Sequence, residues 1–287
     1  MKTVRISGPA DPRLGAYRSV LDRDLVRRHG LFVAEGRLVV ERLIADGRFT
    51  VQSLLVSGTA CRALEPVLDE RPRGFPIYVC EAADFRGITG YDVHRGCLAL
   101  AVRPIPPSID AVVRDARLVV VLDAVTNADN VGGVFRNAAA FGADAVLLDA
   151  GSCDPLYRKA IRTSMAATLR VPFARLAERA GDWPSALADL KARGFALIAL
   201  TASDSAPDLD EFAASLPAGR LALLVGSEGP GLSTASEAAA DYRVHIPIRG
   251  DVDSLNLAVA TGIALHTIAS RAGAHSPSYT RLRLTKP

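Results

Sequence analysis

Asn130 and Arg136 have the residue types and the spacing to hold an anion at the start of a helix. They lie in NADNVGGVFRN (127–137), where we expect a strand to pass into a helix with Asn130 as its N-cap. Gly132 and Arg136 share a helix face, and helical side chains lean toward the N-terminus. Arg136 is therefore expected to reach back across Gly132 to free N–H groups that favour a phosphate or an oxyanion. A surface arginine on an amphipathic helix fits the same pattern.

A glycine-rich turn, GSEGPGLS (226–233), follows the apolar run Leu221–Val225, which has the composition of a buried strand. The turn is not a Walker loop, because Gly231 is followed by Leu and Ser, and its spacing is not that of a dinucleotide fingerprint. Glycines at this place allow a flat ligand to approach the backbone closely. Glu228 is the ionisable residue of the turn. Its carboxylate either belongs to a functional site or is simply exposed to solvent.

A third polar stretch, Asp253–Asn256, is expected to begin the last helix, with Asp253 and Ser254 as candidate N-caps. It follows a second apolar segment, Arg243–Ile248. Because Ser254 already supplies a cap, Asn256 is unexpected inside an apolar helix, and a buried asparagine needs partners that a ligand can supply. Ligands of open α/β sheets bind beyond the carboxyl ends of the strands, so we expect the active site at these loops.

The elements that position these stretches alternate between strand and helix patterns over residues 116–287. The predicted strands are Leu118–Leu122, Ala145–Leu148, Phe195–Leu200, Leu221–Val225 and Val244–Ile248. The predicted helices are Val131–Phe141, Pro155–Thr168, Trp183–Arg193 and Leu255–Ser270. This alternation predicts a mostly parallel α/β sheet.

Residues 1–103 are predicted to form a separate small α/β or α+β domain. Its predicted helices are Asp11–Arg28 and Glu35–Asp46, and its predicted strands are Leu31–Ala34, Val51–Val56, Pro76–Val79 and Gly96–Val102. The following RPIPP (103–107) is stiff and cannot continue a sheet interior. We therefore expect a linker over residues 104–115 between the two domains.

The composition is that of a soluble globular protein: 287 residues, 49% hydrophobic and 23% charged. A net charge of +3 does not by itself predict a nucleic-acid partner. Four scattered cysteines without a CxxC pair indicate buried thiols rather than a disulfide or a metal site. No apolar run has membrane-spanning length and the start lacks a signal peptide's apolar core, so we expect a cytoplasmic protein. Basic residues at 23, 27–29 and in Ser276–Pro287 either face the solvent or contact an RNA backbone.

The order and spacing of the three polar stretches resemble the SpoU/TrmH-type family of the SPOUT superfamily, which are S-adenosylmethionine-dependent RNA ribose 2′-O-methyltransferases. The motifs that carry the resemblance are N-x-G-x-x-x-R-x-A at Asn130–Ala138, G-S-E-G-x-G at Gly226–Gly231, and I-P-I followed by S-L-N at Ser254–Asn256. Arg158–Phe173 is similar to the family's linking helix and next strand. Phe32–Leu43 and His94–Val102 carry a weaker likeness to its small substrate-binding domain, which resembles a ribosomal protein fold.

The resemblance implies an RNA-binding domain over 1–103 and a methyltransferase domain over 116–287, whose parallel sheet contains a deep trefoil knot. It also implies a homodimer, no metal, and S-adenosylmethionine held in the knot. The implied cofactor contacts are Gly226, Ile246, Ile248, Leu255 and Asn256. The implied catalytic residues are Arg136, Asn130, Glu228, Ser254 and Asn256.

By the same resemblance, Arg136 lies at the ribose 2′-hydroxyl. Since a guanidinium stays protonated in proteins, we expect it to stabilise the forming alkoxide, and an RNA phosphate to accept the proton. Asn130 would position the ribose or Arg136, and Glu228 would orient Arg136 or a loop amide. Ser254 and Asn256 would tie the cofactor loop to the substrate.

Three other functions stay open at this point. The acceptor of the methyl group can be a tRNA base instead of a ribose, although the Asn130 and Arg136 pair favours ribose. A non-catalytic RNA-binding factor can keep the same fold. A dinucleotide-dependent oxidoreductase is disfavoured, because the GxGxxG fingerprint is missing. The type of the first domain favours ribosomal RNA over tRNA as the substrate.

Overall fold

The structure is a computed structural model that describes residues 3–18, 22–69, 74–93, 96–203, 205–250 and 254–271. The chain divides into two compact units, each assembled from three segments. Unit 1 contains Met1–Pro107, Asn127–Arg136 and Cys153–Arg170. Unit 2 contains Ser108–Thr126, Asn137–Ser152 and Val171–Pro287. The basic tail Ser276–Pro287 lies outside the described residues, as do His94 and Arg95 of the weaker likeness.

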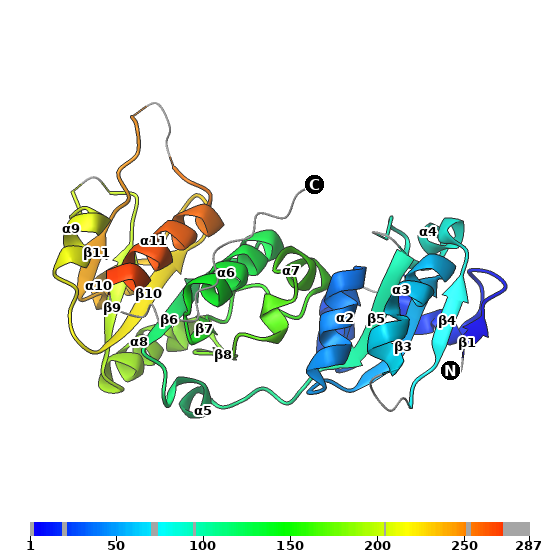
Figure 1. The fold of residues 1–287 in the computed structure, drawn as a ribbon. Coiled ribbons are helices and arrows are strands. Elements are labelled where there is room, and N and C mark those ends of the chain that lie inside the picture. Colours follow the sequence, from blue (N-terminus) through cyan, green and yellow to red (C-terminus); the bar gives the residue numbers. More distant parts are fainter. Residues whose placement is uncertain are drawn as a thin grey trace. The chain divides into compact units, whose positions relative to one another are not determined.

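Unit 1 is built on a five-stranded mixed sheet in the order β1-β4-β3-β5-β2 (Figure 1). Its strands are β1 (Thr3–Arg5), β2 (Leu31–Glu35), β3 (Val51–Ser57), β4 (Ile77–Cys80) and β5 (Cys97–Val102). The helices of its first segment are α1 (Asp22–Arg28), α2 (Arg37–Asp46), α3 (Gly58–Asp69) and α4 (Phe85–Thr89). Apolar side chains of η1 (Pro12–Tyr17), α1 and α4 form one buried cluster with those of β2, β3 and β5. Strands and helices thus alternate along the first segment of this unit.

The later segment of unit 1 adds α7 (Arg158–Thr163), which packs on β2. The first part of α6 (Ala128–Phe141) contacts α7 at Gly132. A Cβ at this glycine would lie 2.7 Å from the carbonyl oxygen of Ala160 and 2.9 Å from the Cβ of Thr163. Gly132 is therefore required by close helix packing, and the prediction that its bare side is open to Arg136 is wrong.

Unit 2 is built on a six-stranded sheet in the order β11-β9-β10-β6-β7-β8, and every adjacent pair is parallel (Figure 1). Its strands are β6 (Leu118–Asp123), β7 (Ala145–Leu148), β8 (Phe173–Arg175), β9 (Phe195–Leu200), β10 (Arg220–Gly226) and β11 (Tyr242–Val244). Its helices are α5 (Ile109–Val113), the end of α6, α8 (Trp183–Ala192), α9 (Leu209–Ala214), α10 (Thr234–Ala239) and α11 (Leu257–Arg271). Side chains of α5, α8 and α10 cover one face of the sheet. The predicted parallel α/β sheet is confirmed.

Two predicted helices are wrong in extent. Asp11–Arg28 contains the 3₁₀ helix η1, whose first amide is capped by the Asp11 side chain, and the separate helix α1. Pro155–Thr168 contains only α7 and a later 3₁₀ turn. Met165 and Ala166 have φ of 53° and 67°, a left-handed backbone that ends an α-helix.

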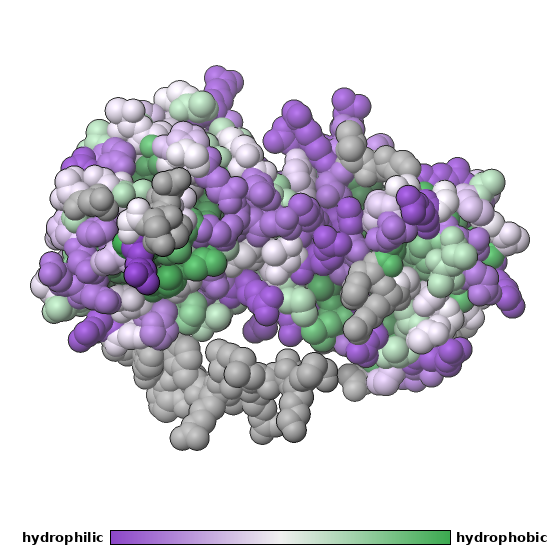
Figure 2. Space-filling view, turned by 90° about the horizontal axis from the view of Figure 1, so that it is seen from above, coloured by the Kyte–Doolittle hydropathy of each residue, from purple (hydrophilic) through white to green (hydrophobic). Residues whose placement is uncertain are grey.

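The surface and the cysteines agree with the composition. Figure 2 shows hydrophilic residues over much of the face that it draws, with hydrophobic residues exposed between them. The four cysteines are buried, as the sequence predicts. Within the described part of the chain, no helix is long and apolar enough to span a membrane.

Candidate active site

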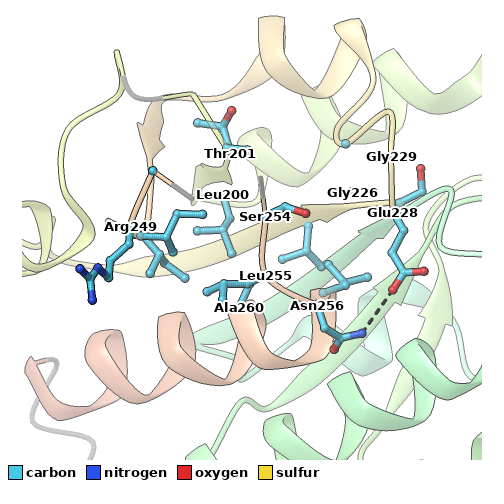
Figure 3. A pocket seen from close by; sticks show the side chains of 18 residues that line it. Leu200, Thr201, Gly226, Glu228, Gly229, Arg249, Ser254, Leu255, Asn256 and Ala260 are labelled. Carbon is cyan, nitrogen blue, oxygen red and sulfur yellow. Dashed lines mark hydrogen bonds between the residues drawn. The ribbon is translucent and has the colours of Figure 1, made fainter. Parts of the chain in front are cut away.

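A pocket of about 820 Å³ lies where three parallel strands of unit 2 end. It is lined by the loops that follow β9, β10 and β11 and by the start of α11 (Figure 3). Parallel strands bring their carboxyl ends to one edge of a sheet, which is where open α/β sheets bind ligands. Seven of the predicted site residues line this pocket: Gly226, Glu228, Ile246, Ile248, Ser254, Leu255 and Asn256.

The glycine loop after β10 folds back on itself, and this shape excludes a side chain at Gly226. A Cβ at Gly226 would overlap the backbone of Gly231 and Leu232. The amide of Gly231 donates to the carbonyl oxygen of Ser227 at 3.1 Å. Gly229 and Gly231 have φ of +89° and +73°, where a residue with a side chain is strained. The spacing of these glycines is therefore a requirement of the loop itself.

Asn256 connects the start of α11 to the glycine loop. Its Oδ1 accepts hydrogen bonds from the amides of Ala258 at 2.9 Å and Val259 at 3.3 Å. Its Nδ2 donates to Oε1 of Glu228 at 3.2 Å (Figure 3). One side-chain amide thus caps a helix with its oxygen and holds a carboxylate with its nitrogen.

The predicted cap of the last helix is wrong. α11 begins at Leu257, and Ser254 is an exposed residue that lines the pocket. Asp253 lies outside the described residues. Asn256 is exposed rather than buried, and it is the N-cap itself, so its amide does not need a ligand to satisfy it.

The I-P-I segment forms an apolar wall of the pocket. β11 spans Tyr242–Val244, so the strand predicted over Val244–Ile248 shares only Val244 with it and is wrong at both ends. Pro247 lies three residues beyond Val244 and has no N–H to donate to a strand ladder. Ile246 and Ile248 line the pocket from this loop, and Ile248 is 39% exposed.

The described lining of the pocket is mainly apolar or uncharged. Glu228 and Arg249 are its charged members, and Figure 3 shows them at opposite ends of the pocket. Its other polar side chains are the hydroxyl groups of Thr201, Ser227 and Ser254 and the amide of Asn256. Apolar walls with a few placed polar groups are typical of a small-molecule site.

Two parts of this lining were not predicted. Leu200 at the end of β9, and Thr201 and Ala202 after it, carry no residue type that indicates chemistry. Their place could have been inferred from the pairing of two buried parallel strands, since β9 lies beside β10 and their carboxyl ends share an edge. Arg249 follows the I-P-I segment directly, and its charge was a usable signal.

Asn130 and Arg136 lie on α6 and are not among the residues that line the pocket. Asn130 is buried and Arg136 is exposed. The prediction that Asn130 caps α6 is wrong, because the helix begins at Ala128. Oδ1 of Asn127 accepts from the amide of Asp129 at 2.9 Å, so Asn127 caps the helix.

Asn137, the residue after Arg136, fixes the second part of α6 to α11 within unit 2. Its Nδ2 donates to the carbonyl oxygen of Ala258 at 2.5 Å. A Cβ at Gly262 would lie 3.0 Å from the same nitrogen, so Gly262 permits this approach.

Among the residues that the structure describes, no group of three or more His, Cys, Asp or Glu side chains is arranged to hold a metal ion.

Comparison with known proteins gives a family match over the second half of the chain. Residues 117–266 match the SpoU rRNA Methylase family. An uncharacterized tRNA/rRNA methyltransferase of Mycobacterium tuberculosis is 43% identical over 274 residues, covering 94% of this chain and 92% of that protein.

Two further relatives extend the comparison. The Bacillus subtilis 23S rRNA (guanosine(2553)-2′-O)-methyltransferase RlmP is 26% identical over 236 residues, covering 82% of this chain and 87% of that protein. The crystal structure of an AdoMet-bound rRNA methyltransferase from Sinorhizobium meliloti superposes with a TM-score of 0.76 at 23% identity, covering 94% of this chain and 98% of that one. The second likeness is one of fold, and it agrees with the parallel α/β sheet of unit 2.

Proposed function

The chain belongs to the SpoU rRNA methylase family, and from this premise we propose that it transfers the methyl group of S-adenosylmethionine to a ribose 2′-hydroxyl of RNA, with ribosomal RNA favoured over tRNA. The observation that carries the proposal is the pocket. The glycine motif and the I-P-I and S-L-N motifs are separate in the sequence, and they line one cavity. The 2′-O activity in the name of RlmP supports ribose as the acceptor.

The pocket fits the cofactor by its volume and by its polar groups. A cavity of about 820 Å³ lies within the range of about 300–1,000 Å³ that holds small molecules. The isoleucines of the I-P-I motif and Leu255 offer apolar walls to an adenine ring, and the loop at Gly226 lets a flat group approach the backbone. Glu228 and Asn256 supply polar contacts at one end. S-adenosylmethionine supplies a methyl group bound to a sulfonium. The neutral thioether that remains after transfer is a good leaving group, so the reaction needs no metal.

Arg136 is the residue that we assign to the 2′-hydroxyl. Its guanidinium stays protonated, so it stabilises the forming alkoxide through charge-assisted hydrogen bonds, and an RNA phosphate accepts the proton. Arg136 lies within the residues 117–266 that match the family, which supports the assignment. In the same proposal, Asn130 positions the ribose or Arg136.

The other assigned residues act from the pocket itself. Glu228 orients Arg136 or a loop amide, and its hydrogen bond to Asn256 supports a fixed position for the carboxylate. Ser254 and Asn256 tie the cofactor loop to the substrate. Each of these side chains lines the cavity that we assign to the cofactor.

Residues 1–103 are proposed to bind the RNA, and residues 116–287 are proposed to carry out methyl transfer. Residues 104–115 are proposed to link these two domains. Arg23 and Arg27 support an RNA-binding role for α1, because both are exposed and four residues apart, so they present one basic face to phosphates. Arg28 pairs with Asp24 at 3.2 Å and is less available.

The trefoil knot and the homodimer belong to the same proposal. α11 supports the homodimer, because it exposes apolar side chains on one face. Val259 and Ile263 are 52% and 38% exposed, and residues four apart lie side by side on a helix. A second copy of the chain is proposed to cover them.

Transfer of a tritiated methyl group from S-adenosylmethionine to total RNA from a strain lacking this protein tests the proposal. A 2′-O-methyl group blocks alkaline cleavage of its phosphodiester, so label in alkali-resistant dinucleotides supports ribose methylation. Label released in mononucleotides would instead show base methylation, as on a tRNA base. No transfer, together with no cofactor binding by calorimetry, would favour a non-catalytic RNA-binding factor.

A further inference from the structure

Asp123 is a buried carboxylate at the carboxyl end of β6 and is not among the residues that line the pocket. It is 4% exposed, and its Cα pairs with Gly226 in the register of β6 and β10. Its Oδ2 accepts a hydrogen bond from the amide of Ser233 at 2.8 Å and from the hydroxyl of Ser236 at 2.7 Å. A buried carboxylate needs such donors, because an unpaired one is strongly destabilising.

One residue therefore holds both ends of the glycine loop. The backbone of Asp123 pairs with Gly226, where the loop begins, and its side chain binds Ser233, where the loop ends. Between these points the loop closes on itself through the hydrogen bond from Gly231 to Ser227. Five lining residues of the pocket lie in this loop: Gly226, Ser227, Glu228, Gly229 and Gly231. A movement of the loop end changes the wall of the pocket.

The hydrogen bonds continue from Asp123 to the single tryptophan of the sequence. Nε1 of Trp183, at the start of α8, donates to Oγ of Ser236 at 2.9 Å, and Ser236 has no exposed surface. The Ser236 hydroxyl thus accepts a hydrogen bond from the indole and donates one to the carboxylate. It acts both as an acceptor and as a donor. Oγ of Ser233 accepts from the amide of Ser236 at 3.3 Å and caps α10.

We propose that Asp123 is a positioning residue of the cofactor pocket, which sets the shape of the glycine loop through Ser233 and Ser236, with Trp183 at the buried end of the chain of hydrogen bonds. The inference rests on the proposed function, since it concerns the same pocket. Asp123 acts through backbone groups of the loop and does not touch the cofactor. Its loss lowers cofactor affinity because the wall residues are no longer held in the binding shape.

Asp149 offers a matched control at the end of the neighbouring strand β7. It is 9% exposed, and its carboxylate accepts from the amide of Gly151 at 2.9 Å and from the amide and hydroxyl of Ser152 at 2.8 and 2.5 Å. This arrangement also joins a buried carboxylate to a serine after a strand. The loop of Asp149 contributes no described residue to the lining of the pocket.

Calorimetry with S-adenosylhomocysteine compares Asp123→Asn with Asp149→Asn. We expect Asp123→Asn to raise the dissociation constant at least tenfold and Asp149→Asn to change it less than twofold, while both lower the midpoint of thermal unfolding. Equal affinities for the two variants would overturn the proposal. If Asp123→Asn does not fold, Ser236→Ala removes one donor to the same carboxylate and gives the same comparison.

A second measurement does not depend on the cofactor. In the unliganded protein, amide hydrogen exchange over 226–233 should become at least tenfold faster in Asp123→Asn and stay unchanged in Asp149→Asn. The emission of Trp183 should shift in Asp123→Asn and Ser236→Ala only. Unchanged exchange and emission would show that Asp123 does not hold the loop. If wild-type protein binds no cofactor, the proposed function fails, and the exchange result still decides whether Asp123 fixes the loop.

Discussion

Asn256 uses the two ends of its side-chain amide for different purposes. The oxygen caps α11, and the nitrogen holds Glu228 of the glycine loop. Aspartate caps helices about as well as asparagine, but it has no N–H to donate. Substitution at this position therefore separates the stability of α11 from the binding of the loop.

Asn256→Asp should keep the free energy of unfolding within about 0.5 kcal/mol, because the cap remains. It places a carboxylate beside Glu228, and we expect the dissociation constant for S-adenosylmethionine to rise about tenfold through repulsion, equal to about 1.4 kcal/mol. Asn256→Ala should lose both functions and lower the free energy of unfolding by about 1 kcal/mol. Urea unfolding and calorimetry measure the two effects, and wild-type affinity in Asn256→Asp would argue against a role for the Glu228 contact.

At the residue scale, the sequence identifies the types and spacing of motif residues better than it identifies their hydrogen-bond partners. The glycines of 226–231 and Asn256 could be predicted as site residues because a glycine-rich turn after a strand, and an asparagine at the start of an apolar helix, are unusual. The motif spacing favours Asn130 as the cap, yet Asn127 has the same side chain and lies earlier in the chain. Only the observed start of α6 distinguishes the two.

At the scale of elements, the packing of α7 on β2 in unit 1 depends on a buried carboxylate. The Glu35 side chain has no exposed surface, and it accepts hydrogen bonds from the guanidinium groups of Arg158 and Arg162. The Cζ of Arg158 also lies 3.8 Å from the centre of the Tyr91 ring. Removing the charge of Glu35 leaves these cations without their buried anionic partner.

Glu35→Gln should lower the free energy of unfolding by about 3 kcal/mol, at the low end for a broken buried pair because the arginines stay partly exposed. The control is Glu41→Gln, whose pair with Arg37 lies at the surface and should cost less than about 1 kcal/mol. Urea unfolding measures both variants. An equal effect of the two would mean that burial of Glu35 contributes nothing to the packing of α7.

The strands β4 and β5 contain two buried thiols, and burial raises the pKa of Cys80 and of Cys97 to about 12. An unfolded thiol ionises near pH 8.5, so the unfolded state releases its protons first as the pH rises. The stability from these thiols is therefore complete below about pH 8.5 and is lost above it. Cys97→Ala should show a smaller fall in urea midpoint between pH 8 and 10.5 than wild type. An identical fall would contradict the raised pKa of Cys97.

Most strands of both sheets could be predicted from apolar runs with clear boundaries, as for β7 and β9. The helix ends could not, because they depend on contacts and backbone angles that residue types do not specify. The left-handed backbone at Met165 and Ala166, which ends α7 early, is one example. Gly132 is another, since its bare face serves contact with α7 and not the reach of Arg136. The strand β11 was overextended, although Pro247 gave a usable warning.

At the scale of the whole molecule, the proposed homodimer depends on the exposed apolar face of α11. Light scattering after size exclusion should give twice the chain mass for wild type. Val259→Asp places a charge on that face and should produce monomers, whereas a charge at exposed Tyr242, on β11, should leave the dimer intact. A monomeric wild type would contradict the proposed homodimer, and a dimeric Val259→Asp would exclude α11 as its interface.

The central claim is that a guanidinium on α6 acts on a ribose hydroxyl beside the cofactor pocket, and the rate of product formation in Arg136 variants tests it most directly. In single turnovers with saturating cofactor, the 2′-O-methylated nucleoside is quantified by mass spectrometry after complete digestion of the RNA. We predict that Arg136→Ala slows its formation by about 10²–10³-fold, and Arg136→Lys by at least about tenfold because lysine lacks the planar fork of donors. Both variants should keep wild-type cofactor affinity. Formation of the 2′-O-methyl product by either variant at close to the wild-type rate would contradict the account.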